Sequence, residues 1–288
     1  MEKPKTWGEC VDYTFESRLT WRNGGGRGSA EIYTGYFTRL RGRSFPVEKI
    51  RPAIISQCVV ELMEEGKLQS TCNRFISAVS TVLNHCFEQE FIHFEPPKFK
   101  RAKEDECQRL TFTKEQVDRI EQIAREEFCS DSLGDIVIGA AYTGMRQGEL
   151  LKLKAKDVDL HLNKIHIGGR PDTKTKAGNY RAVAIHTRLR PILERRLEHA
   201  SPNVCIFGDD WLNRDQLRRQ FNNVTRRYLH LDEGYCFHSL RHSFATWHVQ
   251  GGTPFRQLMD LMGHKNIVTT LIYGKSTDEG RELAMSNI

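Results

Sequence analysis

The chain has 288 residues, a formal charge of +6 and a pI near 8.9. Apolar residues make up 39% and charged residues 28%, and the mean hydropathy is -0.55, which excludes fibrous, disordered and membrane-spanning proteins. The length predicts two domains, and the first residues show no apolar signal region, which favours an intracellular protein.

The cysteines are scattered along the chain without a C-x-x-C pair. In an intracellular protein this spacing is typical of reduced, mainly buried thiols, and it favours neither a disulfide framework nor a zinc site. The eight positions are Cys10, Cys58, Cys72, Cys86, Cys107, Cys129, Cys205 and Cys236. We therefore expect a protein without a metal or cofactor.

Helical patterns dominate the first hundred residues. Helices are predicted over 6–22, 29–41, 54–65 and from 70 to about 87, with a glycine-rich break at 23–28. Residues 46–56 predict a turn with a short helix. The region therefore predicts a small bundle of about four helices.

A composition typical of an interdomain linker follows this bundle. Residues 95–106 contain two prolines, then a basic run and an acidic run, and they show no periodicity. We place the linker at about 95–108, which separates a helical domain (1–105) from a second domain (109–288).

The second domain combines helices with the chain's clear strand signal. Short β-prone runs occur at 158–160, 164–168 and 180–185, and they predict a three-stranded antiparallel sheet. Helices are predicted at 113–128, 131–143, 187–200, 212–229, 240–250, 253–262 and 269–273. The predicted fold class is mainly α with a small antiparallel β-sheet.

Six side chains of the second domain have the chemistry that phosphoryl transfer to a phenol requires. Arginine and lysine neutralise phosphate oxygens, a tyrosine attacks phosphorus, and histidines exchange protons. Each residue alone is a weak signal, because short matches are common. The six are Arg146, Lys174, His238, Arg241, His264 and Tyr273.

The order and spacing of these residues resemble the tyrosine recombinases, the family of lambda-type phage integrases and the Xer and Cre recombinases. The similar boxes are Thr-Gly-Met-Arg-Gln-Gly-Glu-Leu (143–150), His-Ser-Leu-Arg-His-Ser-Phe-Ala-Thr (238–246) and Leu-Met-Gly-His through Tyr (261–273). The resemblance covers about 111–275. The first hundred residues match only as a helical core-binding domain of suitable size, followed by an α+β catalytic domain.

The resemblance implies a role for each residue. Arg146 and Arg241 would hold the scissile phosphate, and His264 would donate a hydrogen bond to a non-bridging oxygen. Tyr273 would attack phosphorus and form a 3′-phosphotyrosyl link, while His238 would accept its proton.

The remaining roles concern the leaving group and the orientation of the site. Lys174, on the turn between the second and third strands, would protonate the departing 5′ oxygen, and Lys176 is the competing candidate. Glu149 resembles the family's acidic residue that orients the site. No metal is implied.

Basic surfaces outside this site predict contacts with double-stranded DNA. Residues 212–229 predict a major-groove helix with interspersed arginines, glutamines and asparagines. Candidate phosphate contacts of the first domain and linker are Arg39, Arg41, Arg43, Lys98, Lys100, Arg101 and Lys103. We expect two domains that close around a duplex, without an extra arm-binding domain, and a tail (274–288) that packs on a neighbouring protomer.

The sequence therefore predicts a site-specific DNA recombinase, an integrase of a phage or other mobile element. It would act in the bacterial cytoplasm at the nucleoid, as a tetramer on an inverted-repeat core site, with directionality or DNA-bending factors as further partners and no membrane. A Xer-like or telomere resolvase with the same chemistry is the close alternative. A DNA-binding regulator with a dead site is the alternative from another class.

Overall fold

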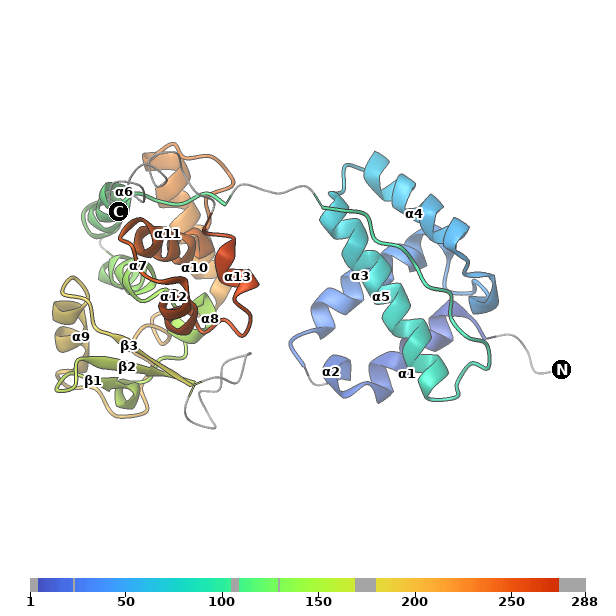
Figure 1. Cartoon of the computed structure of the whole chain (residues 1–288), viewed down its shortest axis with the longest axis horizontal. Coiled ribbons are helices and arrows are strands. Elements are labelled where there is room, and N and C mark those ends of the chain that lie inside the picture. Colours follow the sequence, from blue (N-terminus) through green and yellow to red (C-terminus); the bar gives the residue numbers. More distant parts are fainter. Residues whose placement is uncertain (1–4, 23, 105–108, 129, 169–179, 275–288) are drawn as a thin grey trace, which may run out of the picture. The chain divides into compact units, whose positions relative to one another are not determined.

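The computed structural model describes residues 5–22, 24–104, 109–128, 130–168 and 180–274. The chain divides into two compact units, Met1–Cys107 (unit 1) and Gln108–Ile288 (unit 2), shown in Figure 1. Each unit has its own apolar core. In the part of the chain that is described, no helix is long and apolar enough to span a bilayer.

Unit 1 is a helical bundle built around its longest helix. Its helices are α1 (Trp7–Ser17), α2 (Leu19–Arg22), α3 (Arg27–Arg41), α4 (Pro52–Glu64) and α5 (Gln69–Glu88). Helix α5 packs against α1, α3 and α4. Its Phe75, Val79 and Leu83 are four residues apart, so they share one face, and all three are fully buried. Each buried side chain of this kind contributes about 1.5–3 kcal/mol.

Two features of unit 1 differ from the sequence-based expectation. The helix predicted over 6–22 is interrupted at Arg18, whose backbone is extended (φ -83°, ψ 105°). The first part of the predicted linker lies against α5 (Figure 1), because Asn73 Nδ2 donates to Ala102 O and to Glu104 Oε1, both at 2.9 Å. Phe99 also packs against the core of this unit. Residues 105–108 lie outside the described residues.

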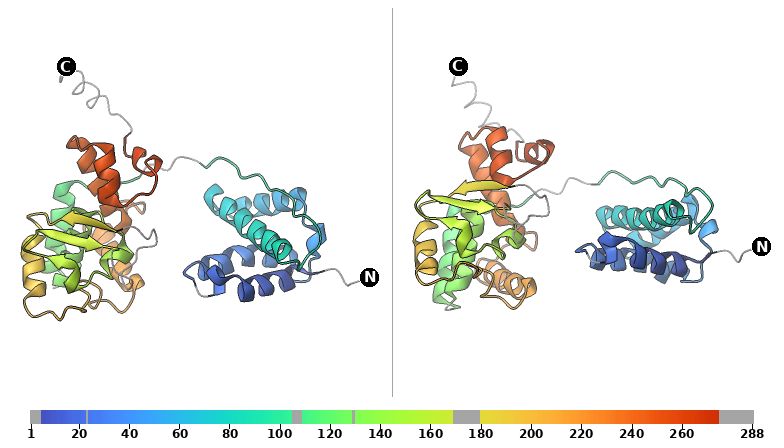
Figure 2. Two further views of the ribbon diagram at one scale, coloured as in Figure 1. Left: turned by 60° about the horizontal axis from the view of Figure 1, so that its bottom comes forward. Right: turned by 90° about the horizontal axis from the view of Figure 1, so that it is seen from below.

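Unit 2 is mainly helical, with its sheet along one side of the helices (Figure 2). Strands β1 (Val158–Asp159), β2 (Lys164–Ile167) and β3 (Arg181–Ala184) are antiparallel in the order β1-β2-β3. The helices are α6 (Lys114–Glu126), α7 (Asp131–Thr143), α8 (Gln147–Leu150), α9 (Arg190–Leu197), α10 (Arg214–Asn223), α11 (Phe237–Gln250), α12 (Phe255–Met262) and α13 (Val268–Leu271). A π-helical segment, Val224–Tyr228, follows α10. The predicted fold class is confirmed.

Helix α7 runs through the core of unit 2 and packs against α6, α8, α10 and α11. Residues 133–141 are all buried, so this helix is enclosed on every side, as expected of a helix at the centre of a core. Asp135 is its one charged buried residue, and it accepts hydrogen bonds from Arg125 (2.8 Å), Arg195 and Arg196 (2.6 Å). These contacts tie α7 to α6 and α9.

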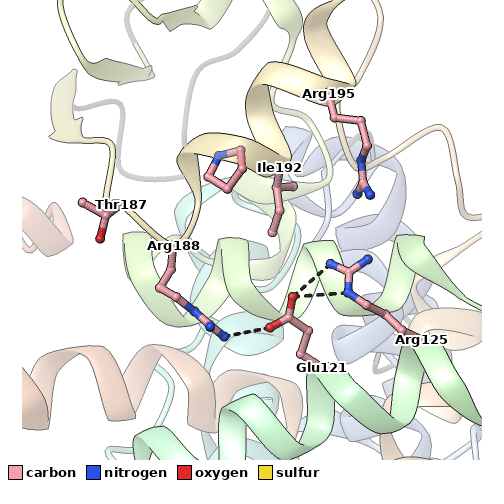
Figure 3. Close-up of a pocket in the computed structure, with 7 residues that line it drawn as sticks. Glu121, Arg125, Thr187, Arg188, Ile192 and Arg195 are labelled. Atoms are coloured by element: carbon pink, nitrogen blue, oxygen red, sulfur yellow. Dashed lines mark hydrogen bonds and ion pairs between the residues drawn. The ribbon is translucent and has the colours of Figure 1, made fainter.

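A hollow of about 650 Å³ lies between α6 and α9 (Figure 3). Glu121 bridges two arginines at its floor, accepting from Arg188 Nη2 at 2.8 Å and from Arg125 Nη2 at 3.0 Å. The third arginine at this hollow, Arg195, pairs with Asp135. Because its cations are already neutralised by carboxylates, we assign the hollow to the structural network that fastens α9 to α6.

Candidate active site

Two glycines form the turns from which the site is built. Gly144 ends α7 in the left-handed region (φ 61°), and a Cβ there would lie 2.5 Å from the ring of Phe244. Gly263 ends α12 in the same way (φ 63°). Only glycine adopts this conformation without strain. The turns place Arg146 directly before α8 and His264 directly after α12.

Arg241 lies on α11 and is more deeply buried than Arg181, with 2% of its surface exposed against 7%. It donates through Nη1 to the carbonyl of Gly144, and through Nη2 to the carbonyl of Met262 (2.7 Å) and to His264 Nε2 (2.9 Å). Among the described residues no carboxylate lies within ion-pair distance of Arg241. Burial and the nearby charge of Arg146 lower the pKa of Arg241 to about 9, so it stays charged at neutral pH.

His264 orients this arginine. A guanidinium can only donate, so Nε2 of His264 accepts its hydrogen bond and the ring proton resides on Nδ1, which donates to Thr270 Oγ1 at 2.9 Å. Burial and the charge of Arg241 lower the pKa of His264 to about 4, so the ring is neutral. Both ring nitrogens of His264 are engaged within the protein, and its expected hydrogen bond to a phosphate oxygen stays a prediction.

Glu149 joins two further arginines beneath the cleft. Its carboxylate accepts from Arg181 Nη2 at 2.7 Å and from Arg146 Nη1 at 3.1 Å, and it also caps α8 by accepting from the backbone N–H of Arg146 at 2.9 Å. Arg181, on β3, further donates to the carbonyl of Leu261 at 2.9 Å. Burial alone would raise the pKa of Glu149, but the hydrogen bond and charge of Arg181 hold it below its ordinary value. The carboxylate therefore links β3 to α8, and Arg181 links both to the end of α12.

Tyr273, just after α13, lies against α11 of its own chain. Its hydroxyl is 2.7 Å from Nδ1 of His242, and the guanidinium of Arg109 lies 5.8 Å from the centre of its ring. Partial burial raises the pKa of Tyr273, against the opposing charges of Arg109 and Arg241. The phenol is therefore protonated at neutral pH.

The histidine expected to take the tyrosine proton is not the one that contacts it. His238 is exposed and lines a cleft of about 280 Å³, together with Arg146, Lys152, His166 and Arg214. Its ring meets that of His242 edge to face, with centroids 4.8 Å apart. The structure thus places His238 at the cleft and His242 at the phenol, and the expected role of His238 as proton acceptor stays a prediction.

The sixth predicted residue cannot be placed. Lys174, and its competitor Lys176, lie outside the described residues, as does the tail from 275 onward. Of the six side chains, the structure brings five into one region of unit 2: Arg146, His238, Arg241, His264 and Tyr273.

The electrostatics of this region favour an anion. Arg146 and Arg181 share a single carboxylate, that of Glu149, and Arg241 is almost fully desolvated without a carboxylate within ion-pair distance among the described residues. A buried cation without a counter-ion carries a large desolvation cost in the folded protein. An anion that pairs with this cation offsets a large part of that cost, which favours anion binding. In the described ranges no three histidine, cysteine or acidic side chains gather as metal ligands would.

Sequence reasoning missed three residues of this region. His242 follows Arg241 in the motif, and its position four residues after His238 places both rings on one helix face. Arg181 had a weak signal, as a charged residue at the start of a predicted strand whose other residues are apolar. Arg109 had none, because its proximity to Tyr273 arises only from the fold.

The chain is similar in sequence to a known family and to its members. Residues 111–279 match the sequence model of the phage integrase family. The chain is 31% identical over 215 residues to tyrosine recombinase XerA of Thermococcus kodakarensis, which covers 72% of each chain. It is 33% identical over 146 residues to tyrosine recombinase XerC of Halalkalibacterium halodurans, which covers 48% of each.

Solved structures share the fold at low sequence identity. The Tn1549 transposon integrase in complex with transposon right end DNA has a TM-score of 0.75 at 16% identity, covering 98% of this chain and 99% of that one. A lambda integrase dimer bound to a core site has a TM-score of 0.73 at 19% identity, covering 96% and 80%.

Proposed function

The chain belongs to the phage integrase family of tyrosine recombinases, and we propose that it cleaves and rejoins duplex DNA at specific sites through a 3′-phosphotyrosyl bond at Tyr273. A phosphotyrosyl diester retains the energy of the broken phosphodiester, so another 5′ hydroxyl can reseal the strand without ATP. This chemistry suits strand exchange.

One observation carries the proposal: a desolvated Arg241 without a carboxylate partner among the described residues, beside Arg146 at an open cleft. Two arginines neutralise the non-bridging oxygens of a phosphodiester as charge develops on them, and their fixed positions avoid reorganisation during the reaction. Three carbonyl and imidazole acceptors already fix Arg241 before DNA binds.

The leaving group needs a proton, and we propose that Lys174 supplies it. Its assignment rests on the resemblance of its Thr-Lys-Thr context to the family pattern, and Lys176 remains the competitor. Arg181, on the strand that follows these lysines in the chain, is held by Glu149 and the carbonyl of Leu261. This supports a hairpin anchored to the rest of the site.

The surface of α10 and the π-helical segment supports DNA binding. Arg219, Arg226 and Arg227 are exposed and, with Asn222 and Asn223, line a hollow of about 460 Å³. Arginine and asparagine read guanine and adenine edges in the major groove. We propose that this surface gives part of the sequence preference.

In unit 1 the candidate contacts divide into two groups. Arg39, Arg41 and Arg43 each pair with a carboxylate of their own unit, which weakens the case for them. The exposed basic residues after α5 remain as candidates for phosphate contacts: Lys98, Lys100, Arg101 and Lys103. We propose that unit 1 is a core-binding domain and unit 2 the catalytic domain.

The biological setting belongs to this proposal as well. The likeness in fold to a transposon integrase and to lambda integrase supports an element that integrates or excises DNA in a bacterial cytoplasm. Because the chain is similar to Xer recombinases, we propose a Xer-like resolvase as the second candidate function. In either case we propose a tetramer on an inverted-repeat core site, with DNA-bending or directionality factors as further partners.

A nicked suicide duplex tests the chemistry. The duplex is first selected for binding from a random library, then synthesised with a nick that releases a short 5′ fragment after cleavage. We expect a covalent protein–DNA adduct with the native chain and none with Tyr273→Phe, which still binds DNA within about threefold, since one hydroxyl contributes little to a large interface.

Tyr142→Phe is the matched control, because Tyr142 is also partly buried in unit 2 and burial likewise raises its pKa. It should form the adduct at the native rate. A covalent adduct formed by Tyr273→Phe would contradict the assignment of Tyr273 as the nucleophile. A native chain that binds the duplex but forms no covalent adduct would favour a DNA-binding regulator without catalytic activity.

A further inference from the structure

We propose that Arg181 is a positioning residue of the recombination reaction, which fixes Arg146 and the turn before His264 in the geometry that binds the scissile phosphate. The inference rests on the proposed function, because it assigns a role within that reaction. Arg181 lies on β3, outside the sequence boxes that contain the other two residues. It acts through Glu149 and through the backbone at the end of α12.

All three nitrogens of the Arg181 guanidinium donate hydrogen bonds. Nη2 donates to Glu149 Oε2 at 2.7 Å and Nη1 to Glu149 Oε1 at 3.4 Å, while Nε donates to the carbonyl of Leu261 at 2.9 Å. The guanidinium also packs against the turn after α12, since a Cβ at Gly263 would lie 2.8 Å from Arg181 Nη1. A planar guanidinium holds the carboxylate and the carbonyl at a fixed angle to each other, which a lysine ammonium cannot do because it acts as a point charge.

One side of this contact leads to Arg146. The Glu149 carboxylate accepts from Arg146 Nη1 at 3.1 Å and from its backbone N–H at 2.9 Å. Within the described ranges Glu149 is the one acceptor of the Arg146 guanidinium, whose side chain is 36% exposed at the cleft. A long side chain with this exposure keeps one orientation only if its partner is held in place, and Arg181 holds that partner.

The other side leads to the second cation of the site. Leu261 is followed by Met262, whose carbonyl accepts from Arg241 Nη2 at 2.7 Å. His264 lies directly after the same helix end, and β3 packs against α12. Because Arg181 holds the carbonyl of Leu261, it fixes the backbone from which these contacts are made. One side chain therefore connects the supports of both arginines that are proposed to bind the phosphate.

The burial of Arg181 also supports a positioning role. Arg181 is 7% exposed, and so is the side chain of its partner Glu149. A buried ion pair gains little net stability over well-packed apolar side chains, because both charges lose their hydration. The pair does fix the direction of its hydrogen bonds. Donors stabilise the charge of the transition state only when they are held in place, and a displacement of about 1 Å costs about 100-fold in rate.

Two suicide duplexes that differ in one group test this role. One has the natural scissile phosphate. The other has a methylphosphonate, in which a methyl group replaces one non-bridging oxygen and removes the negative charge. Cleavage is measured in single turnover at saturating protein, so that duplex affinity does not enter the rate. A neutral methylphosphonate needs less neutralisation by arginine, so its cleavage depends less on the position of Arg146.

Arg181→Lys keeps the charge but cannot hold both partners at once. On the phosphate duplex we expect it to cleave about 30-fold to 100-fold more slowly than the native chain, the cost of a displaced donor. On the methylphosphonate duplex it should cleave within about fivefold of the native rate. Arg146→Gln should show the same preference, because it removes the donor that Arg181 positions. Arg181→Met, which lacks the charge as well, should show a preference at least as large.

Arg196→Lys is the matched control. Arg196, on α9, also pairs with a buried carboxylate, that of Asp135 at 2.6 Å, and it also donates to a main-chain carbonyl, that of Ile206 at 2.7 Å. Its substitution weakens unit 2 away from the proposed phosphate site. A smaller folded fraction slows cleavage of both duplexes by the same factor, so the ratio of the two rates should stay within about twofold of the native ratio.

The outcomes separate this inference from the proposed function. If the native chain forms no adduct with the phosphate duplex, the proposed function fails. If the native chain forms the adduct and Arg181→Lys slows both duplexes by the same factor, or slows neither, Arg181 has no positioning role and the inference is wrong. A change of ratio in Arg196→Lys as large as that in Arg181→Lys would also overturn it, because any loss of rigidity in unit 2 would then have the same effect.

Discussion

Replacing Glu149 with glutamine should destabilise unit 2 more than any exposed substitution. The carboxylate is 7% exposed and accepts from Arg181 at 2.7 and 3.4 Å and from Arg146 at 3.1 Å. A neutral amide leaves Arg181 buried without its carboxylate partner. Breaking a buried ion pair costs about 3–5 kcal/mol.

Scanning calorimetry of the full chain measures this cost. For a unit of this size about 1 kcal/mol shifts Tm by about 2–4 °C, so the transition of unit 2 should fall by about 6–20 °C at pH 7. The transition of unit 1 should not move. Glu127→Gln is the control, because Glu127 is exposed at the end of α6, and it should shift Tm by less than about 2 °C.

The pH dependence follows from the lowered pKa of Glu149 in the folded chain. A carboxyl with a depressed folded pKa contributes its stability above its unfolded pKa, about 4.3, and loses it as the pH falls through the folded pKa. The gap in Tm between native chain and Glu149→Gln should therefore narrow as the pH falls below about 4. A gap under about 2 °C at pH 7, or one that widens in acid, would refute the reasoning.

Two further predictions concern the turn and the cation around the site. Gly144→Ala places a Cβ 2.5 Å from the Phe244 ring at a φ of 61°, so we expect urea unfolding to show a loss of at least about 2 kcal/mol in the free energy of unfolding. Cleavage should also be slower, because the Gly144 carbonyl that holds Arg241 must shift. An unchanged free energy of unfolding would contradict this geometry. Arg109→Gln removes the cation over the Tyr273 ring, so the pKa of the phenol should rise, measured by absorbance at alkaline pH as a difference from Tyr273→Phe. An unchanged phenol pKa would show that the cation exerts no influence on Tyr273.

Local patterns accounted for most of the elements, because helix and strand periods are properties of neighbouring residues. The apolar stripe of α5 and the alternation in β2 are visible in the sequence, and both elements form where they are predicted. Helix α11 begins at Phe237, three residues before the predicted start, so His238, Arg241 and His242 lie on one helix. Its first turn contains no apolar repeat that would indicate the start.

The sequence by itself determined which chemistry this protein carries, because the residue types of the motifs and their order specify arginine-assisted attack by a tyrosine on phosphate. Only the tertiary structure decided which atoms meet. The contact between Gly144 and Arg241 joins residues 97 apart in the chain, and that between His242 and Tyr273 joins residues 31 apart. Such contacts depend on how helices pack, since a hydrogen bond requires an accuracy of a few tenths of an ångström that no spacing along the chain encodes. For that reason the sequence shows His238 and His242 near Arg241 in one motif, and only the fold shows that His242 contacts Tyr273.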